Sequence, residues 1–188
     1  MTDRRARFET AALPHLSAAY NLARWLLHDE SSAEDVVQEA YLRAFRFYEH
    51  LRGASARPWL LGIVRNACYD WMRQQRHADD QFEFDEMRDS EEAATLHGSA
   101  SGDPASIFER HAQDARVNAA IGALAPPFRE VIVLREIEEM SYEDIARVAG
   151  IPVGTVMSRL SRARAALRVA LAEEVVAAND SRRHDACR

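Results

Sequence analysis

Hydroxyl and basic side chains recur along residues 153–173 at spacings that place them on one face of a helix. An apolar stripe follows the same segment at positions i, i+4, i+7 and i+11: Val156, Leu160, Ala163 and Leu167. The side chains expected to project away from this stripe are Thr155, Ser158, Ser161 and Arg162. Hydroxyl and guanidinium groups hydrogen-bond to base edges and phosphates, so the chemistry expected of this face is recognition of the DNA major groove.

The charge around this segment is strongly basic. Between Arg147 and Arg168 there are five Arg and no Asp or Glu, a local charge of +5 in a chain whose net charge is −6. Contact with phosphates requires this kind of asymmetry. The alternative interpretation is a solvated amphipathic helix that binds nothing.

The residues before this segment are typical of the first half of a helix-turn-helix. Ser141 and Asp144 form a capping box, which predicts that a helix begins near Tyr142. Gly150 lies where the chain must leave that helix with a positive φ, and Pro152 prevents simple continuation. Two helices joined by a Gly-centred turn, the second with a basic outer face, have the layout of a DNA-reading helix-turn-helix.

Length and composition indicate a globular all-α protein. The 188 residues are 47% apolar and 29% charged, and apolar residues recur at helical spacing without strand-like alternation. No stretch approaches 18 uninterrupted apolar residues, the N-terminus lacks the apolar run of a secretory signal, and only two Cys are present, so we expect a cytoplasmic protein. Helices are predicted over residues 10–28, 32–50, 58–77, 106–123, 127–138, 141–149 and 153–173.

Charge and composition divide the chain into two small helical domains. Residues 79–114 carry eleven acidic and two basic side chains and include HGSASGDPAS, which lacks the apolar content to fold alone. We therefore predict a first domain over 1–78, an acidic flexible linker over 79–105, a helix-turn-helix domain over 106–175 and a C-terminal tail over 176–188.

Charge is also polarised within the first domain. Residues 28–39, HDESSAEDVVQE, hold five acids and no Arg, and Ser32 with Asp35 predicts that a helix begins there. Residues 43–76 hold seven Arg against two acids. An acidic surface suits a basic protein partner, whereas a basic surface suits nucleic acid.

In the helix that follows Pro58, periodicity separates core from surface. The stripe expected to be buried contains Leu60, Val64, Ala67 and Trp71. The residues largely off this stripe, which are better candidates for contact with a nucleic-acid strand, are Arg65, Asn66, Tyr69, Arg73 and Arg76. Cys68 is interpreted as a small core residue.

Two long motifs occur in order along the chain. The first domain carries AEDVVQEAYLRAF and RPWLLGIVRNACYDWMRQQR, and the second carries LAPPFREVIVLREIEEMSYEDIARVAGIPVGTVMSRLSRARAAL. With the acidic segment between them, these motifs resemble bacterial RNA polymerase sigma factors of the extracytoplasmic-function group. The resemblance covers roughly residues 10–78 and 115–171.

The resemblance implies two surfaces that bind core RNA polymerase. The segment from Ala33 to Phe45 would dock on the clamp helices of the β′ subunit. The residues that this role would involve are Asp35, Gln38, Glu39 and Arg43. In the second domain, Phe128, Leu134 and their neighbours would pack on the flap of the β subunit.

The resemblance also implies two surfaces that bind promoter DNA. The loop from Tyr48 to Pro58 and the helix after it would capture flipped bases of the minus-ten element and hold the non-template strand. The residues assigned to this role are Arg52, Arg57, Arg65, Asn66, Tyr69, Asp70, Arg73 and Arg76. The residues assigned to the minus-thirty-five element are Thr155, Met157, Ser158, Ser161 and Arg162. Because relatives often have Arg in place of Met157 and a larger side chain in place of Ser161, the preferred DNA sequence does not follow.

The function that the resemblance implies is promoter-specific initiation without catalysis and without a cofactor, restrained by an anti-sigma factor. By the same resemblance, the acidic linker would thread through polymerase toward the active-site cleft. The alternative interpretation is a plain solvated tether between the domains. One rival is a stand-alone helix-turn-helix regulator, which leaves the acidic residues 28–39 unexplained. A second is a sigma mimic that sequesters an anti-sigma factor, which predicts eroded basic faces. An enzyme has least support, because no Ser-His-Asp or phosphate-loop pattern occurs, and His184 with Cys187 does not complete a zinc site.

Overall fold

A computed structural model describes residues 2–51, 55–81 and 114–185 of the chain. The elements are α1 (Thr2–Ala12), η1 (Leu13–His15), α2 (Leu16–Leu27), α3 (Glu30–Phe47), η2 (Tyr48–His50), α4 (Ala56–Gln81), a helical segment over 114–122, α6 (Pro126–Ile132), the π-helical turn η3 (Val133–Ile137), α7 (Tyr142–Ala149) and α8 (Val153–Asp185). These ranges contain no strand, which confirms the all-α fold. None of their helices is both long enough and apolar enough to cross a membrane.

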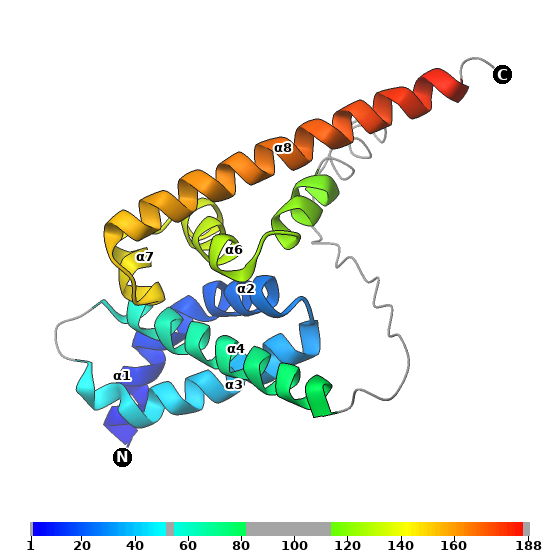
Figure 1. Ribbon diagram of the computed structural model, residues 1–188. Coiled ribbons are helices and arrows are strands. Elements are labelled where there is room, and N and C mark those ends of the chain that lie inside the picture. The colour runs from blue at the N-terminus through cyan, green and yellow to red at the C-terminus, as the bar shows by residue number, and fades with distance from the viewer. Residues whose placement is uncertain (1, 52–54, 82–113, 186–188) are drawn as a thin grey trace, which may run out of the picture.

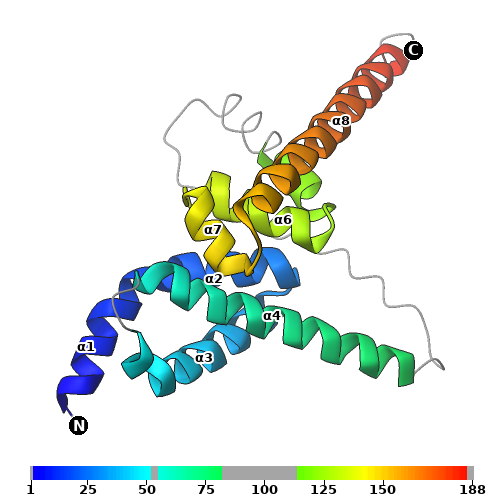
Figure 2. The ribbon, with the colours of Figure 1, turned by 60° about the vertical axis from the view of Figure 1, so that its left-hand side comes forward.

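The first domain is a bundle in which α2, α3 and α4 pack against one another. Small side chains line the facing stripes of α2 and α3, including Ala19, Ala23 and Ala40, all fully buried, and they let the helix axes approach closely. The N-terminal helix α1 adds a smaller cluster through Phe8, whose ring meets that of Phe45 edge-on at 5.3 Å. Figures 1 and 2 show this bundle beneath α6 and α7, with α8 extending well beyond both.

Several predicted boundaries are wrong for local reasons. The single helix predicted over 10–28 is broken at η1, where Pro14 cannot donate a backbone hydrogen bond. The next helix is capped by Asp29 and not by Ser32. The Asp29 carboxylate accepts a hydrogen bond from the Ser32 amide at 2.6 Å, and His28 before it has a φ of 59° that ends α2. Residues 176–185, predicted as a tail, continue α8.

The predicted linker lies mostly outside the described residues. Helix α4 runs to Gln81, three residues into the predicted linker. Residues 82–105 of the predicted linker and Cys187 of the tail are not described.

The helix-turn-helix has the local chemistry that its sequence predicts. The amide of Asp144 donates to the Ser141 hydroxyl at 3.1 Å, which caps α7, and Gly150 ends it with a φ of 65°. Three members of the stripe predicted on α8 are buried: Val156, Leu160 and Ala163. The fourth, Leu167, is half-buried and packs against the same core. The Ser141 cap and the turn glycine are therefore confirmed, whereas the Asp144 carboxylate accepts from the Ser141 hydroxyl and from Arg147.

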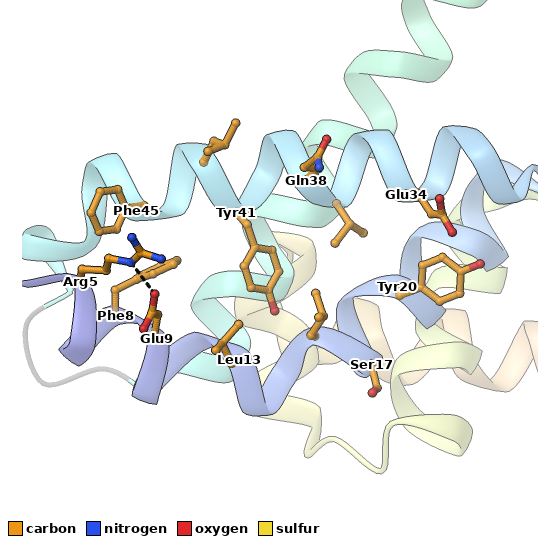
Figure 3. A pocket seen from close by; sticks show the side chains of 13 residues that line it. Arg5, Phe8, Glu9, Leu13, Ser17, Tyr20, Glu34, Gln38, Tyr41 and Phe45 are labelled. Atoms are coloured by element: carbon orange, nitrogen blue, oxygen red, sulfur yellow. Dashed lines mark hydrogen bonds and ion pairs between the residues drawn. The ribbon is translucent and has the colours of Figure 1, made fainter.

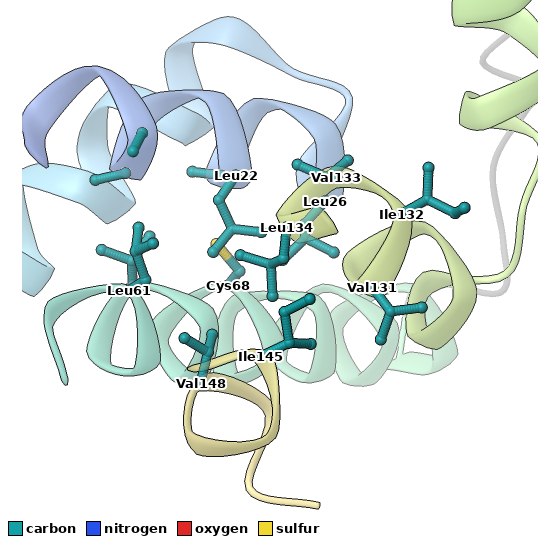
Figure 4. Close-up of a cluster of buried hydrophobic side chains, with 14 of the residues drawn as sticks. Leu22, Leu26, Leu61, Cys68, Val131, Ile132, Val133, Leu134, Ile145 and Val148 are labelled. Carbon is teal, nitrogen blue, oxygen red and sulfur yellow. The ribbon is translucent and has the colours of Figure 1, made fainter. Parts of the chain in front are cut away.

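The two domains share one apolar core. Leu22, Leu61 and Cys68 of the first domain and Leu134 and Ile145 of the second are all fully buried in one cluster (Figure 4). This cluster joins α4 to α7 and α2 to α6. Packing between the domains is a property that the sequence pattern alone did not predict.

The two domains approach each other closely at a glycine of α4. A Cβ atom built at Gly62 would lie 3.7 Å from the Val148 carbonyl oxygen and 3.9 Å from its Cα, both in the backbone of α7. Alanine fits at this distance, whereas a longer side chain would meet the α7 backbone. Gly62 therefore leaves room for a methyl group but not for a larger side chain between α4 and α7.

The turn glycine gives a stability prediction with an internal control. We expect Gly150→Ala to lower the free energy of unfolding by about 1 kcal/mol, because its φ of 65° is unfavourable for a residue with a Cβ. Gly154→Ala, four residues later in α8 and also without neighbours within 4 Å, should instead raise stability by up to about 1 kcal/mol. Urea denaturation of both variants checks this, and a Gly150→Ala protein as stable as the wild type would contradict the turn geometry.

Candidate nucleic-acid and polymerase-binding surfaces

The outer face of α8 gathers the residues predicted to read the minus-thirty-five element. Met157, Ser158, Ser161 and Arg162 are exposed, and Thr155 is half-buried in the first turn. The Ser158 hydroxyl donates to the Thr155 carbonyl oxygen at 3.0 Å. An exposed face on the first turns of the second helix, polar except for Met157, can enter a major groove.

Acidic residues reduce the basic charge counted in this region. Arg147 forms an ion pair with Asp144, and Arg164 pairs with Glu136 at 2.6 Å. Among the described residues, Arg162 has no such acid partner and remains free for a ligand. Counting charge over a sequence window missed the neutralisation, because both acids precede the window.

The exposed side of α3 carries the acidic residues predicted to bind polymerase. Asp35, Gln38 and Glu39 are exposed, and half-buried Arg43 pairs with Glu39 at 2.9 Å. The pairing neutralises part of the predicted acidic surface, since an i,i+4 pair of this kind satisfies both charges locally.

An apolar groove of about 960 Å³ runs beside these acids, between α3 and the α1–α2 segment (Figure 3). Its walls include Leu13, Leu16 and Leu42, which are 53%, 44% and 59% exposed. Tyr41 crosses its floor and donates its hydroxyl to the Ala12 carbonyl at 3.0 Å, and burial raises the pKa of this phenol to about 12. Exposed apolar surface with an acidic rim is typical of a protein-binding site. The sequence analysis did not predict this groove. Leu13, Leu16 and Leu42, which lie outside the buried stripes, were the signal that could have indicated an exposed apolar surface.

The residues predicted to hold minus-ten DNA fall into two groups. Asn66, Arg73 and Arg76 are exposed on α4, half-buried Asp70 pairs with Arg73, and Arg52 lies outside the described residues. The other three, Arg57, Arg65 and Tyr69, face the second domain. The structure therefore does not bring all eight to one open surface.

Glu138 of the second domain holds Arg57. One Nη atom of Arg57 donates to the Glu138 carboxylate and to its backbone carbonyl, both at 2.8 Å. The Asn21 amide donates to the same carboxylate at 3.1 Å. The π-helical turn η3 and the positive φ of Glu139, 53°, bracket Glu138 and fix its position.

Glu130 of the second domain holds Arg65 and Tyr69. Its carboxylate is fully buried and accepts from Arg65 Nε at 2.8 Å and from the Tyr69 hydroxyl at 3.0 Å. The Arg65 guanidinium also lies 4.2 Å from the centre of the Tyr69 ring. Burial by itself lowers the pKa of Arg65, but the hydrogen bond and charge of Glu130 raise it overall. Burial and then the charge of Glu130 raise the pKa of Tyr69.

Two conserved-sequence families match the two domains. Residues 12–78 match Sigma-70 region 2, and residues 114–167 match Sigma-70, region 4. The chain is 36% identical over 172 residues to the RNA polymerase sigma-H factor of Pseudomonas aeruginosa, across 90% of this chain and 88% of that protein. It is 31% identical over 159 residues to the ECF RNA polymerase sigma factor SigE of Mycolicibacterium smegmatis, across 85% of this chain but only 59% of that protein.

The chain belongs to the extracytoplasmic-function sigma factors of RNA polymerase. Its fold is similar to that of the sigma factor RpoE of Bartonella quintana, solved in complex with the anti-sigma factor NepR. The TM-score is 0.72 at 28% identity, across 88% of this chain and 96% of that one. The likeness thus extends over both domains.

In this sigma factor, one residue predicted to meet the polymerase flap is inaccessible. Leu134 is fully buried in the core between the domains, and Phe128 is half-buried against the same core. Helical periodicity marks Leu134 as apolar but does not tell burial within the chain from burial against a partner.

The sigma factor also has a buried cation that sequence reasoning missed. Arg129 is 6% exposed and donates to the carbonyl oxygens of Trp25 and Leu124, each at 2.8 Å. Burial lowers the pKa of Arg129, and the last carbonyls of α2 carry the negative end of the helix dipole that suits a cation. Arg129 therefore attaches α6 to the end of α2.

Proposed function

We propose that this sigma factor binds core RNA polymerase and directs promoter-specific transcription initiation. The observation that carries the proposal is the combination, in one chain, of an exposed helix-turn-helix face with a separate acidic and apolar face on a region 2 domain. A stand-alone regulator would need only the first of these faces. Initiation is then a binding function: the protein supplies specificity and holds melted DNA while polymerase performs the chemistry.

The first domain would dock on core polymerase through α3. The exposed Asp35, Gln38 and Glu39 provide a polar rim, and the groove lined by Leu13 and Leu42 provides apolar area. Protein interfaces commonly combine an apolar centre with a charged rim that selects the partner. By resemblance to the family, α3 would contact the clamp helices of β′. A coiled coil with basic and apolar side chains would complement the acidic rim and the apolar groove.

The second domain would read the minus-thirty-five element with the outer face of α8. Exposed Ser158, Ser161 and Arg162 supply donors for bases and phosphates, and Met157 supplies an apolar contact such as a thymine methyl group accepts. Phe128 and its neighbours would meet the β flap after rearrangement of the core that now covers Leu134.

The basic side of α4 would hold the melted minus-ten strand. Arg73, Arg76 and Asn66 are exposed toward a ligand, although Arg73 pairs with Asp70 and Asn66 accepts a hydrogen bond from Arg65. Arg57, Arg65, Tyr69 and Asp70 would complete the face. Unstacked bases must regain stacking and hydrogen bonds, and arginine with tyrosine offers both. We further propose that an anti-sigma factor restrains this cytoplasmic protein, which the complex of the related RpoE with NepR supports.

Charge reversal on α3 tests the docking surface. We expect Asp35→Arg/Glu39→Arg to lower core-dependent run-off transcription from a promoter library at least about tenfold, because like charges then face a basic partner. Asp114→Arg/Glu143→Arg, which reverses two exposed acids of the second domain, should retain activity. Promoters transcribed by the wild type should share two spaced elements, and an active α3 variant would contradict docking through this face.

Removing Arg162, an exposed cation of α8, tests promoter reading. Arg162→Ala should weaken binding to minus-thirty-five duplexes by about 1 to 3 kcal/mol if Arg162 contacts a base, with loss of preference at one position. If it contacts a phosphate, affinity should fall evenly across sequences and the salt slope should decrease by about one unit. Binding to duplex variants at several salt concentrations separates the two. An unchanged affinity everywhere would remove Arg162 from the site, and Arg164→Ala, whose side chain Glu136 already holds, serves as the control.

A further inference from the structure

One large apolar side chain stands on the otherwise polar outer face of α8. Met157, near the start of this helix, is 53% exposed. Burial of apolar surface is what stabilises a fold, so a Met exposed to this degree contributes little to it. Within the part of α8 whose side chains are described, Val169 is the other large apolar residue exposed to a similar degree. Met157 is therefore available for an apolar contact outside the chain.

The surface beside Met157 is open toward the preceding turn. Gly154 lies three residues earlier and is exposed, and a Cβ atom built there would meet nothing within 4 Å. Long side chains of a helix lean toward the turn before them, so we expect the Met157 side chain to border this bare backbone. The N-terminal turns of a recognition helix are the part that contacts base edges in the major groove.

Two polar side chains near Met157 use their donors within the protein. The Ser158 hydroxyl donates to the Thr155 carbonyl oxygen at 3.0 Å. Arg164 follows Met157 by seven residues, which places both on one side of α8. The Arg164 Nε and one Nη donate to the Glu136 carboxylate at 3.1 and 2.6 Å. In this arrangement neither donor is directed to a base beside Met157.

The chemistry of a Met side chain selects among the base edges of the major groove. Thymine presents a C5-methyl group there, whereas the edges of guanine, adenine and cytosine are polar. Met has no donor, and its thioether is a weak acceptor. Against a polar edge it would displace water without replacing the hydrogen bonds, which is unfavourable. Against a methyl group it gains buried apolar area.

We propose that Met157 and Gly154 form a site for the methyl group of one thymine in the minus-thirty-five element. The methyl group would pack on the Met157 side chain and occupy the space above the Gly154 backbone. The inference rests on the proposed function, because it assigns a base to the face of α8 that would read this element. An Arg at the position of Met157, which relatives often have, would instead suit guanine, so this residue determines specificity.

The test removes single methyl groups from the DNA. The full chain first selects duplexes from a pool of randomised sequence. Each thymine of a selected duplex is then replaced in turn by deoxyuridine, which lacks only the C5-methyl group. Fluorescence anisotropy measures the affinity of the full chain for each duplex.

Two variants alter the site in different ways, and two controls accompany them. Met157→Ala removes the apolar contact, whereas Met157→Leu keeps it. Gly154→Ala fills the space above the backbone at a position where we expect the fold to gain stability, so its effect on recognition would not reflect unfolding. Val169→Ala shortens the other exposed apolar side chain, about 18 Å farther along α8.

The wild type should bind about fourfold more weakly when one particular thymine loses its methyl group, because the burial of one such carbon is lost. Met157→Ala and Gly154→Ala should each lose the preference for thymine over deoxyuridine at that base pair. Met157→Leu and Val169→Ala should keep it. Agreement of the two site variants on the same base pair would place the methyl group between their side chains.

The methyl site is overturned if the wild type tolerates deoxyuridine at every position, or if either site variant keeps the full preference for thymine. Selection of no preferred sequence by the full chain would overturn it as well. Run-off transcription by the wild type with core polymerase tests the proposed function separately. Transcription together with any of these results would reject the methyl site alone, whereas no transcription by the wild type would reject the proposed function.

Discussion

The fully buried carboxylate of Glu130 is the interaction on which the arrangement of the two domains depends. An ionised carboxylate without partners inside a protein is so unfavourable that it must find donors. Its donors, Arg65 and Tyr69, lie on α4 of the other domain, so satisfying Glu130 fixes the position of α6 against α4. The apolar contacts around Leu134 and Ile145 add area but specify position less strictly, because apolar packing has no required donors.

The contacts between the domains involve only part of the basic side of α4. Glu130 of α6 pairs with Arg65 of α4, and Glu138, the residue after η3, pairs with Arg57. Arg73 and Arg76, nearer the C-terminal end of α4, remain exposed. The groove beside α3 is lined by first-domain residues alone (Figure 3), and Ser158 and Arg162 are exposed on α8. The interface between the domains therefore covers Leu134 and engages Arg57, Arg65 and Tyr69, while the groove beside α3 and the outer face of α8 stay exposed.

The sequence predicted best what a few neighbouring residues decide. The cap at Ser141 and the turn at Gly150 involve partners within four residues, and the stripe of Leu60 and Val64 follows one helix period. The helix start at Ser32 was wrong because Asp29 offers an equally good cap at a better place in the chain. Local signals of similar strength do not say which one the backbone uses.

What the sequence did not predict depends on residues far apart in the chain. Arg65 and Glu130 are 65 positions apart, and Arg57 and Glu138 are 81 apart, so no periodicity or charge count connects them. The same separation explains why Leu134 was assigned to a partner surface and why Arg129 was overlooked. Whether the assigned DNA contacts function as such stays a prediction, and the structure adds that three of them are now held by acids.

The most direct test of the central claim is a double-mutant cycle across the domain interface, measured by urea denaturation of the full chain. The cycle compares the wild type with Arg65→Met, Glu130→Gln and the double variant. Residues in contact are expected to show a coupling energy between about 0.5 and 3 kcal/mol, and a buried, charge-assisted pair should lie in the upper half of that range. Additive effects within about 0.5 kcal/mol would show that the two side chains do not meet in solution, and the packing of the two domains would be contradicted.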